Sequence, residues 1–502
     1  MYTPGCHLLC HDDVIGSRRV SWILYLLDPD IPWKPEWGGA LRLYPTEHLE
    51  TPDGDKVRVP QPDFSLSIPP AWNQLSFFTV QPGESFHDVE EVYRRGLEEK
   101  AEEDGGRVRM AISGWFHIPQ EGEEGYEEGL EEKLAEKSSL AQLQGGKADV
   151  FDEPQSQWVD NPDWEEQAKQ EDDELTENDI DFLIKFMNPN YLVPDTVEEL
   201  SNMFGDESSL RLAQFLSNKF SARLREYLES KDHEANPSLS NNPHSKQSMV
   251  GVARPPHKQR YLYRKAIQPI PTTPYPENDG MTPYDDLVDI LFPHPAFMKW
   301  ISLVTGITLT KSNIFARRFR RGLDYTLATA YEEEDPQLEV CLGITPSRGW
   351  GDEDEEPEEA AEEEAKQNGS SSSKKSKKKG KAKEPEPKPE EEVGGYEMYM
   401  AGEDDTDHPS VPTGEASTST GAGQRRKAKA DPAIYKSAAD DEDDGILFSQ
   451  PAAWNNLAIV LRDRGVLRFT KYVSKSAKGD RWDVCAEYGV EFGEDEDDED
   501  DE

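Results

Sequence analysis

Two residues near the start of the chain, His11 and Asp13, have the types and the spacing of metal ligands. They stand two positions apart, so on an extended segment both side chains point to the same face. A distant third ligand, His87, follows an aromatic stretch and a turn and completes a triangle on one side of a metal. Two histidines and one carboxylate leave coordination positions open, which suits Fe(II) that must also bind an organic acid and O₂. The sequence therefore predicts a non-haem iron site.

A zinc site on Cys6, His7, Cys10 and His11 is the alternative assignment. Alternation along an extended segment opposes it, because the two cysteines fall on the face opposite the two histidines. Structural zinc sites also take paired ligands from separate segments. The cysteines are therefore expected to be small buried hydrophobic residues.

An organic acid bound beside the iron needs a cation, and two arginines follow His87 at the start of a predicted strand. Arg109 directly precedes an apolar run, and Arg107 stands two residues earlier, on the same side of an extended strand. A guanidinium grips a carboxylate through two parallel hydrogen bonds. We expect Arg109 to lie deeper and to be the anchor, with Arg107 as its competitor. Tyr2 and Tyr25 offer phenolic hydrogen bonds, and aromatic packing in strands is an equal alternative for them.

The elements that must position these residues are strands. Arg19–Leu27 and Asn73–Val80 are rich in aromatic and β-branched residues, and Gln81-Pro82-Gly83 is one of the turn signals between such stretches. Several short strands without helical periodicity predict a sandwich or jelly roll over residues 1–118.

Beyond residue 118 the composition of the sequence changes. Residues 119–173 are acidic and polar and are interpreted as a linker. Thr176 is predicted to cap a helix that runs to Met187, with Asp179 at the capping-box position. Apolar residues at intervals of four predict another helix, and two more are expected at 285–291 and 296–305. The residues of that four-residue pattern are Leu212, Leu216, Phe220, Leu224 and Leu228.

Charge and cysteine usage limit the class of protein. The net charge of −47 argues against nucleic acid or an anionic membrane as a direct partner and favours a basic partner. The alternative is that the acidic tracts are disordered and bind no partner. Four cysteines in 502 residues form no disulfide framework, which indicates a reducing compartment. No apolar run is long enough to span a bilayer and no signal peptide is evident, so cytoplasm, nucleus or both are expected.

Four short motifs occur twice in the same order. The first occurrences lie within residues 5–116 and the second within residues 322–488. The four pairs are Gly5–Asp13 with Gly322–Ala330, Gly38–Tyr44 with Gly394–Met400, Pro70–Leu75 with Ala452–Leu457, and Arg109–Phe116 with Arg481–Tyr488. The repetition predicts that one β fold occurs twice, with low-complexity tracts at 352–392 and 403–445 inserted as loops in the second copy. There Ala328 and Ala330 take the places of the first two metal ligands and Phe469 that of the third, so we expect no iron site in it.

In six segments the chain closely resembles the eukaryotic, in particular fungal, prolyl 3-hydroxylases and prolyl 3,4-dihydroxylases, which belong to the Fe(II)/2-oxoglutarate dioxygenases. The segments are His11–Asp13, Arg19–Leu27, Trp37–Tyr44, Trp72-Asn73, Phe86–Val92 and Arg109–Phe116. The resemblance implies a mainly β protein with flanking helices and two double-stranded β-helix (jelly-roll) domains. The implied parts are a catalytic domain at 1–118, the acidic linker at 119–173, a degenerate domain at 174–490 and an acidic tail at 491–502. Because the family has helices and opening strands upstream of its first ligand, the first domain is expected to be incomplete at its N-terminal side.

The resemblance also implies a function. The implied iron ligands are His11, Asp13 and His87, and the implied 2-oxoglutarate-binding residues are Arg109, Tyr2 and Tyr25. L-ascorbate is implied as the reductant, and a prolyl residue of a small-subunit ribosomal protein as the substrate. Roles in translation termination and oxygen sensing follow, with translation-termination or transcription-regulatory proteins as further partners. The alternative is a non-catalytic adaptor that uses the metal-free second barrel.

Overall fold

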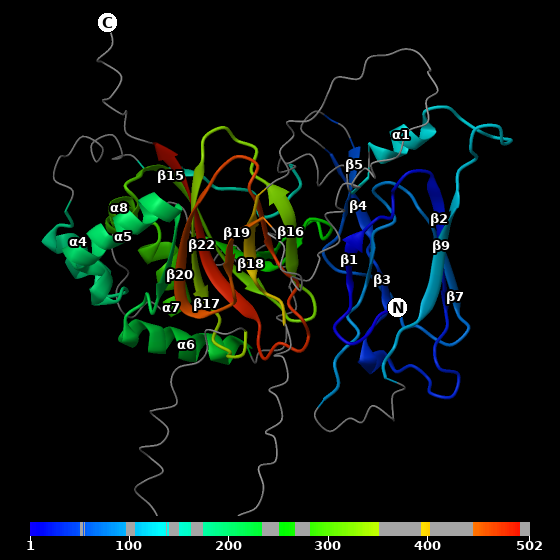
Figure 1. The fold of residues 1–502 in the computed structure, drawn as a ribbon, viewed down its shortest axis with the longest axis horizontal. Coiled ribbons are helices and arrows are strands. Elements are labelled where there is room, and N and C mark those ends of the chain that lie inside the picture. Colours follow the sequence, from blue (N-terminus) through cyan, green and yellow to red (C-terminus); the bar gives the residue numbers. More distant parts are fainter. Residues whose placement is uncertain are drawn as a thin grey trace, which may run out of the picture.

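The computed structural model describes residues 1–50, 54, 56–96, 106–136, 138–139, 150–161, 174–232, 250–266, 282–350, 393–401 and 445–491. The strands form two units that stand side by side, blue to cyan and green to red in Figure 1. The predicted insertions at 352–392 and 403–445 and the acidic tail at 491–502 lie outside the described residues, apart from residues 445 and 491 at their borders.

The first unit is built from short antiparallel strands, as predicted. One sheet has the order β1-β8-β3-β6, a second has the order β7-β2-β9, and β4 pairs with β5. The predicted strands at 19–27 and 73–80 correspond to β2 and β7. The elements are β1 (Leu8–His11), β2 (Arg18–Tyr25), η1 (Pro35–Trp37), β3 (Leu41–Leu43), β4 (Thr46–Glu50), β5 (Lys56–Pro60), β6 (Leu66–Ile68), β7 (Leu75–Thr79), β8 (His87–Val89), β9 (Ala111–His117) and α1 (Leu130–Ala135).

The second unit contains two larger sheets and a layer of helices. Its sheets have the orders β11-β20-β17-β22-β15-β14-β12, with β10 paired to β15, and β13-β16-β21-β18-β19. Its helical elements are α4 (Glu177–Leu183), η2 (Pro189–Leu192), α5 (Pro194–Glu207), α6 (Asn218–Asp232), α7 (Pro283–Asp285), the π-helix η3 (Asp286–Leu291) and α8 (Pro295–Thr305). Its strands are β10 (Val159–Asp160), β11 (Ser209–Ala213), β12 (Val250–Val252), β13 (Gln259–Arg260), β14 (Leu262–Lys265), β15 (Thr308–Phe319), β16 (Tyr325–Ala330), β17 (Gln337–Ile344), β18 (Glu397–Met400), β19 (Ile446–Gln450), β20 (Trp454–Arg462), β21 (Leu467–Thr470) and β22 (Arg481–Glu491).

The helix predictions are confirmed in three places and wrong in part of a fourth. Thr176 and Asp179 form the expected capping box at α4, although the helix ends at Leu183 and not at Met187. η3 and α8 occupy the predicted ranges. The helix expected from Leu212 onward begins only at Asn218. Leu212 instead lies in β11 and pairs with Leu457 of β20. A spacing of four between two leucines does not distinguish a helix turn from a strand followed by a loop. Here the segment forms a strand because β20 offers an edge with which it can pair.

No single helix in the described ranges is long and apolar enough to cross a bilayer. The bent pair Pro283–Leu291 and Pro295–Thr305, which meet at 71°, passes that test only together. Its apolar side chains, including Phe297 and Trp300 at 0% exposure, are buried in the core of the second unit.

The two units share their strand order. The order β1-β8-β3-β6 recurs as β16-β21-β18-β19, and β7-β2-β9 recurs as β20-β17-β22. The turns recur as well, since Gly38 and Gly394 have φ of 71° and 74° and each leaves no room for a Cβ beside a carbonyl oxygen of the facing segment. Asn73 and Asn455, each next to a repeated tryptophan, have φ of 54° and 59°. The repeated motifs therefore mark equivalent positions in equivalent strands.

The pairing register corrects the counterparts of the metal ligands by one residue. His11 pairs with His87 across β1 and β8, as Thr329 pairs with Arg468 across β16 and β21. Both pairings contain a register shift at the same place, and hydrogen bonding, not similarity of letters, sets such a register. Thr329 and Arg468 offer no imidazole, so the second unit still lacks the ligand set. The predicted counterparts Ala328, Ala330 and Phe469 are thus replaced by Thr329, Tyr331 and Arg468.

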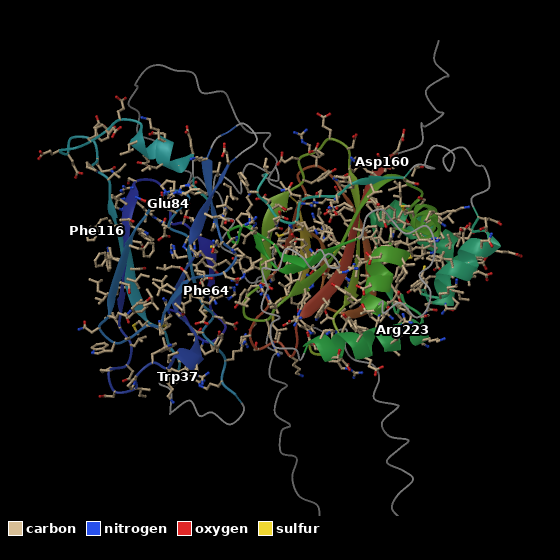
Figure 2. The ribbon with its side chains drawn as sticks, turned by 180° about the vertical axis from the view of Figure 1, so that it is seen from behind. Trp37, Phe64, Glu84, Phe116, Asp160 and Arg223 are labelled. Atoms are coloured by element: carbon tan, nitrogen blue, oxygen red, sulfur yellow. The ribbon has the colours of Figure 1, made fainter. Side chains whose placement is uncertain are left out.

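The outer face of the β7-β2-β9 sheet is apolar and bare among the described residues. Phe77 and Phe116 are 71% and 64% exposed, and Figure 2 shows Phe116 on the side of the first unit that faces away from the second. The strand pairing sets seven apolar residues in adjoining rows: Leu75, Leu24 and Ile112, then Phe77 and Trp22, then Val20 and Phe116. Their counterparts in the second unit are almost fully buried in a core shared with the helices: Leu457, Leu342, Val484, Ile459, Val340, Leu338 and Tyr488. Among the residues that the structure describes, no layer covers this face of the first unit, whereas helices cover the equivalent face of the second unit (Figure 1).

The units meet along the strands that carry the histidines. The ring of His7 stacks on Tyr472 with centroids 4.0 Å apart. Glu91, fully buried, accepts hydrogen bonds from Ser474 Oγ at 2.6 Å and from the backbone amide of Lys475 at 2.7 Å. Both contacts lie at the end of the β1–β8 pair where Leu8 faces Val89, so the second unit holds that end in place.

Candidate metal centre

Three side chains converge where β1 meets β8. Nε2 of His11 lies 3.3 Å from Oδ1 of Asp13, and Nε2 of His87 lies 3.7 Å from Oδ2 of the same carboxylate. One ligand atom from each of the three lies within 4.8 Å of the others. Ligand atoms that share an ion at about 2.0–2.2 Å need this kind of proximity. The structure therefore brings together the residues that the sequence singled out.

Backbone carbonyls orient both imidazole rings. Nδ1 of His11 hydrogen-bonds the carbonyl oxygen of Leu9 at 2.7 Å, and Nδ1 of His87 hydrogen-bonds that of Ser85 at 2.7 Å. A carbonyl only accepts, so each Nδ1 carries the hydrogen and each Nε2 presents a lone pair to the centre. Phe78 packs its ring against His87 with centroids 4.5 Å apart. Both rings are held in the tautomer and direction that metal binding requires.

The carboxylate of Asp13 is held in place by Trp115. Its Nε1 donates a hydrogen bond to Oδ2 at 3.1 Å, and Arg18 lies over the same indole ring at 3.7 Å. Asp13 has a φ of 62°, a strained backbone conformation that is concentrated at functional sites. Trp115 was not singled out from the sequence, although it shares the inward face of β9 with Arg109 by simple alternation.

The electrostatics of the three groups suit a cation. Burial raises the pKa of Asp13, but the hydrogen bond and charge of His11 outweigh burial and leave that pKa well below its usual range. Burial lowers the pKa of His87 to about 4, so this ring is neutral near pH 7, as a metal ligand must be. Burial also lowers the pKa of His11, yet the bond to Asp13 outweighs it and the net direction is upward. Asp13 therefore stays ionised, with His11 at 3.3 Å and Arg18 at 4.0 Å as its cationic neighbours, and a divalent metal would take the place of the proton on His11.

Asp12, between the two ligands, has a structural role. It is 1% exposed, and its carboxylate accepts hydrogen bonds from Ser139 Oγ at 2.8 Å, Ser139 N at 3.0 Å and Val14 N at 3.2 Å. Burial raises the pKa of Asp12. Asp13 and not Asp12 joins His11, as predicted, although Asp13 follows the end of β1 with a φ of 62°, so strand alternation is not what brings the two side chains together.

Arg109 lies in the interior of the first unit at 3% exposure. Its Nε donates to the carbonyl oxygen of Gly39 at 2.7 Å and its Nη2 donates to Tyr25 Oη at 3.2 Å. The rings of Tyr2 and Tyr25 each lie 5.0 Å from the guanidinium carbon. Nη1 has no hydrogen-bond partner within the part of the chain that the structure describes. The side chain is therefore fixed at two points with one edge left for a carboxylate.

Arg107 does not face the same side. Its φ of 50° breaks the extended alternation, and its Nη1 donates to the carbonyl oxygens of Tyr93 and Arg94, both at 3.1 Å. The guanidinium lies over Trp37 at 5.5 Å. The expectation that both arginines share one face is wrong, and the structure separates the competitors.

The residues of the alternative zinc site do not gather. Cys10 is 2% exposed and His7 stacks on the second unit, away from the triad. The one other grouping of possible ligands among the described residues is Cys341, Asp483 and Cys485. There the carboxylate already receives Arg317 at 2.7 Å and Arg481 at 3.0 Å, so guanidinium groups hold the place a metal would take.

Two protein families match the chain. A model described as the 2OG-Fe(II) oxygenase superfamily matches residues 1–117. One described as "Oxoglutarate and iron-dependent oxygenase degradation C-term" matches residues 178–497, more than half of the chain. The chain belongs to the oxoglutarate- and iron-dependent oxygenases. This membership implies Fe(II) and 2-oxoglutarate, and the residues gathered at β1 and β8 fit such a metal.

Relatives place the chain more closely. The prolyl 3,4-dihydroxylase OGFOD1 of Ostreococcus tauri is 28% identical over 500 residues, which is 98% of this chain and 76% of that protein. The prolyl 3-hydroxylase OGFOD1 of Mus musculus is 31% identical over 228 residues, 45% of this chain and 30% of that protein. The prolyl 3-hydroxylase sudestada1 of Drosophila melanogaster is 34% identical over 119 residues, 23% and 19% of the two chains. The predicted homology to this family is confirmed.

Solved structures give a weaker likeness. A prolyl-4-hydroxylase of Pseudomonas putida covers 59% of this chain and 99% of its own at 9% identity, with a TM-score of 0.30. A prolyl hydroxylase of Trichoplax adhaerens, in complex with a hypoxia-inducible-factor peptide, covers 59% and 89% at 8% identity, with a TM-score of 0.29.

Proposed function

We propose that this chain hydroxylates a prolyl residue of a protein substrate, with Fe(II) held by His11, Asp13 and His87 and 2-oxoglutarate anchored by Arg109. The observation that carries the proposal is the convergence of the three ligand atoms within 4.8 Å. The relatives that are named prolyl hydroxylases support the choice of proline.

The bound iron and 2-oxoglutarate supply the oxidising power toward a C–H bond, and the protein supplies position. Carbonyl-bound Nδ1 atoms fix the direction of both histidine rings, and Trp115 fixes the carboxylate of Asp13. Arg109, supported by Tyr25 and packed against Tyr2, receives the distal carboxylate of the co-substrate. A charged hydrogen bond in a buried site is stronger than one in water, which favours binding of the dianion.

The substrate we propose is a small-subunit ribosomal protein, hydroxylated at ring carbon 3, as the family resemblance implies. The net charge of −47 supports a basic partner of this kind, since ribosomal proteins carry positive charge to bind RNA. The proposal includes L-ascorbate as the reductant of the iron, roles in translation termination and oxygen sensing, and action in cytoplasm and nucleus.

The proposed architecture is two double-stranded β-helix domains, a catalytic one at 1–118 and a degenerate one at 174–490, joined by the linker at 119–173. The identical strand orders of the two units support it. In this arrangement the degenerate domain supports the catalytic strands β1 and β8 through Glu91 and His7.

The test is iron- and O₂-dependent decarboxylation of 2-oxoglutarate by the purified chain, with and without a proline-containing peptide from the small-subunit protein. We expect peptide-stimulated turnover that Asp13→Ala abolishes and that Asp206→Ala, an exposed control on α5, leaves unchanged. Absence of both iron binding and turnover in the natural chain would favour the non-catalytic adaptor. Turnover that no proline peptide stimulates would leave a dioxygenase with a different substrate.

A further inference from the structure

A cavity of about 260 Å³ opens in the second unit at the place that the candidate metal centre takes in the first. Thr329 and Arg468, the register counterparts of His11 and His87, both line it. Neither residue has the imidazole nitrogen of its counterpart. The cavity therefore occupies the place of the metal centre but has no histidine ligands at the two equivalent positions.

The floor of this cavity is an ion-pair network with balanced charges. Arg468 lies 2.8 Å from the carboxylates of both Glu339 and Glu397. Arg462 pairs with Glu339 at 2.9 Å, and Arg317 pairs with Glu397 at 2.9 Å. Burial raises the pKa of both glutamates, but the guanidinium groups outweigh it and leave both pKa values lowered. Asp483, Glu487 and Arg481 complete the network, which then has four guanidinium groups and four carboxylates. The floor therefore has charge to position a ligand's polar atoms but no surplus charge to attract an ion.

Within the described part of the chain, the rim of the cavity carries one cation without a carboxylate partner. Lys258 pairs with Asp152 at 2.9 Å. Lys265 is 8% exposed, and its Nζ donates to the backbone carbonyl oxygen of Gln155 at 2.5 Å. No carboxylate lies within ion-pair distance of it among the described residues, and the nearby Glu153 accepts a hydrogen bond from Tyr263 instead. Burial lowers the pKa of Lys265, as expected for a desolvated ammonium without a counter-ion.

The remaining walls suit a short carbon chain. Tyr261, Phe315 and Leu327 are largely apolar residues of the cavity lining, and Thr329, which has a hydroxyl group, belongs to the lining as well. Glu487 also lines it, but Arg468 at 3.7 Å balances its charge. A water molecule needs about 10–15 Å³ of such space, and drug-sized pockets begin at about 300 Å³. The room therefore fits a small organic molecule and not a folded peptide.

We propose that this cavity binds a small organic carboxylate, with Lys265 as its counter-ion and the wall of Tyr261 and Phe315 against its carbon chain. The site is separate from the metal centre of the first unit, and its ligand binds without iron.

Ligand-detected saturation-transfer NMR on the full chain, without added metal, tests the proposal with butyrate and succinate as probes. The background is Arg109→Gln, which disables the co-substrate anchor of the first unit. We expect saturable binding whose dissociation constant rises at least about tenfold in Lys265→Met, because a charged hydrogen bond to the ligand is lost. Lys219→Met, at an exposed position on α6, is the matched control and should leave binding unchanged. Removing a desolvated charge should not lower the melting temperature, so Lys265→Met is expected to fold.

A second variant keeps the lysine and removes the space. Ala330→Leu, on the lining of the cavity, should also abolish the signal. Binding that persists in either variant, or no saturable binding of either acid to the Arg109→Gln background, overturns the proposal. Loss in both variants with retention in Lys219→Met supports it. Prolyl hydroxylase activity is not read in any of these measurements, so their failure leaves the function proposed for the first unit untouched.

Discussion

Replacing Arg109 with alanine should raise the 2-oxoglutarate requirement of the chain sharply. The guanidinium is fixed by Gly39 O at 2.7 Å and Tyr25 Oη at 3.2 Å, and it presents its remaining edge to the interior. A hydrogen bond to a charged group contributes about 1.5–3 kcal/mol, and about 1.4 kcal/mol is tenfold in binding, so the dissociation constant should rise about 10- to 150-fold. The same change leaves a buried carbonyl without its donor, which costs about 1–3 kcal/mol of stability.

The matched control is Arg107→Ala. Arg107 is also buried and also donates to backbone carbonyls, at Tyr93 and Arg94, so its loss should destabilise the fold to a similar degree. It should not alter 2-oxoglutarate affinity, because its guanidinium lies over Trp37 and not beside Tyr25. The two variants therefore separate a loss of stability from a loss of the co-substrate anchor.

The assay is 2-oxoglutarate titration of the Fe(II)-loaded chain under anaerobic conditions, with melting temperature recorded for each variant. Equal affinity in Arg109→Ala and the natural chain, together with weakened binding in Arg107→Ala, would reverse the assignment. Equal weakening in both would show that the effect is structural.

Three further outcomes follow from burial and charge. Burial lowers the pKa of His257 to about 3, so as the pH falls below about 6.5 the unfolded chain binds a proton there before the folded chain does. The free energy of unfolding should therefore fall by up to about 1.4 kcal/mol per pH unit toward about pH 3. His257→Phe should flatten that slope when urea unfolding is measured at several pH values. Tyr488→Ala should cost about 3–5 kcal/mol, as large buried aromatic deletions do, whereas Phe116→Ala on the bare face should change stability by less than about 0.5 kcal/mol, measured by chemical denaturation. Glu91→Ala should cost about 1–3 kcal/mol by stranding buried donors and should speed hydrogen exchange in β8, while Glu84→Ala, an exposed control visible in Figure 2, should do neither.

The local sequence determined much of the candidate site. The types and spacing of His11 and Asp13 identified two ligands correctly, although the left-handed conformation of Asp13 just after β1, and not the strand period of two, brings them together. The capping box at Thr176 and Asp179 is likewise local, since two residues three positions apart make all of its hydrogen bonds. The repeated Gly-Gly and Trp-Asn turns were visible because they need backbone conformations that few residues adopt. These features require only neighbours along the chain.

Other features were decided only when strands paired. The register shift beside His11 moved its counterpart to Thr329, because interstrand hydrogen bonds and not letter similarity set the alignment. Leu212 became part of a strand because β20 offered an unpaired edge. The left-handed turn at Arg107 separated it from Arg109, which alternation alone could not foresee. Each outcome depends on contacts between residues far apart in sequence, where the free energy of pairing and burial outweighs local preference.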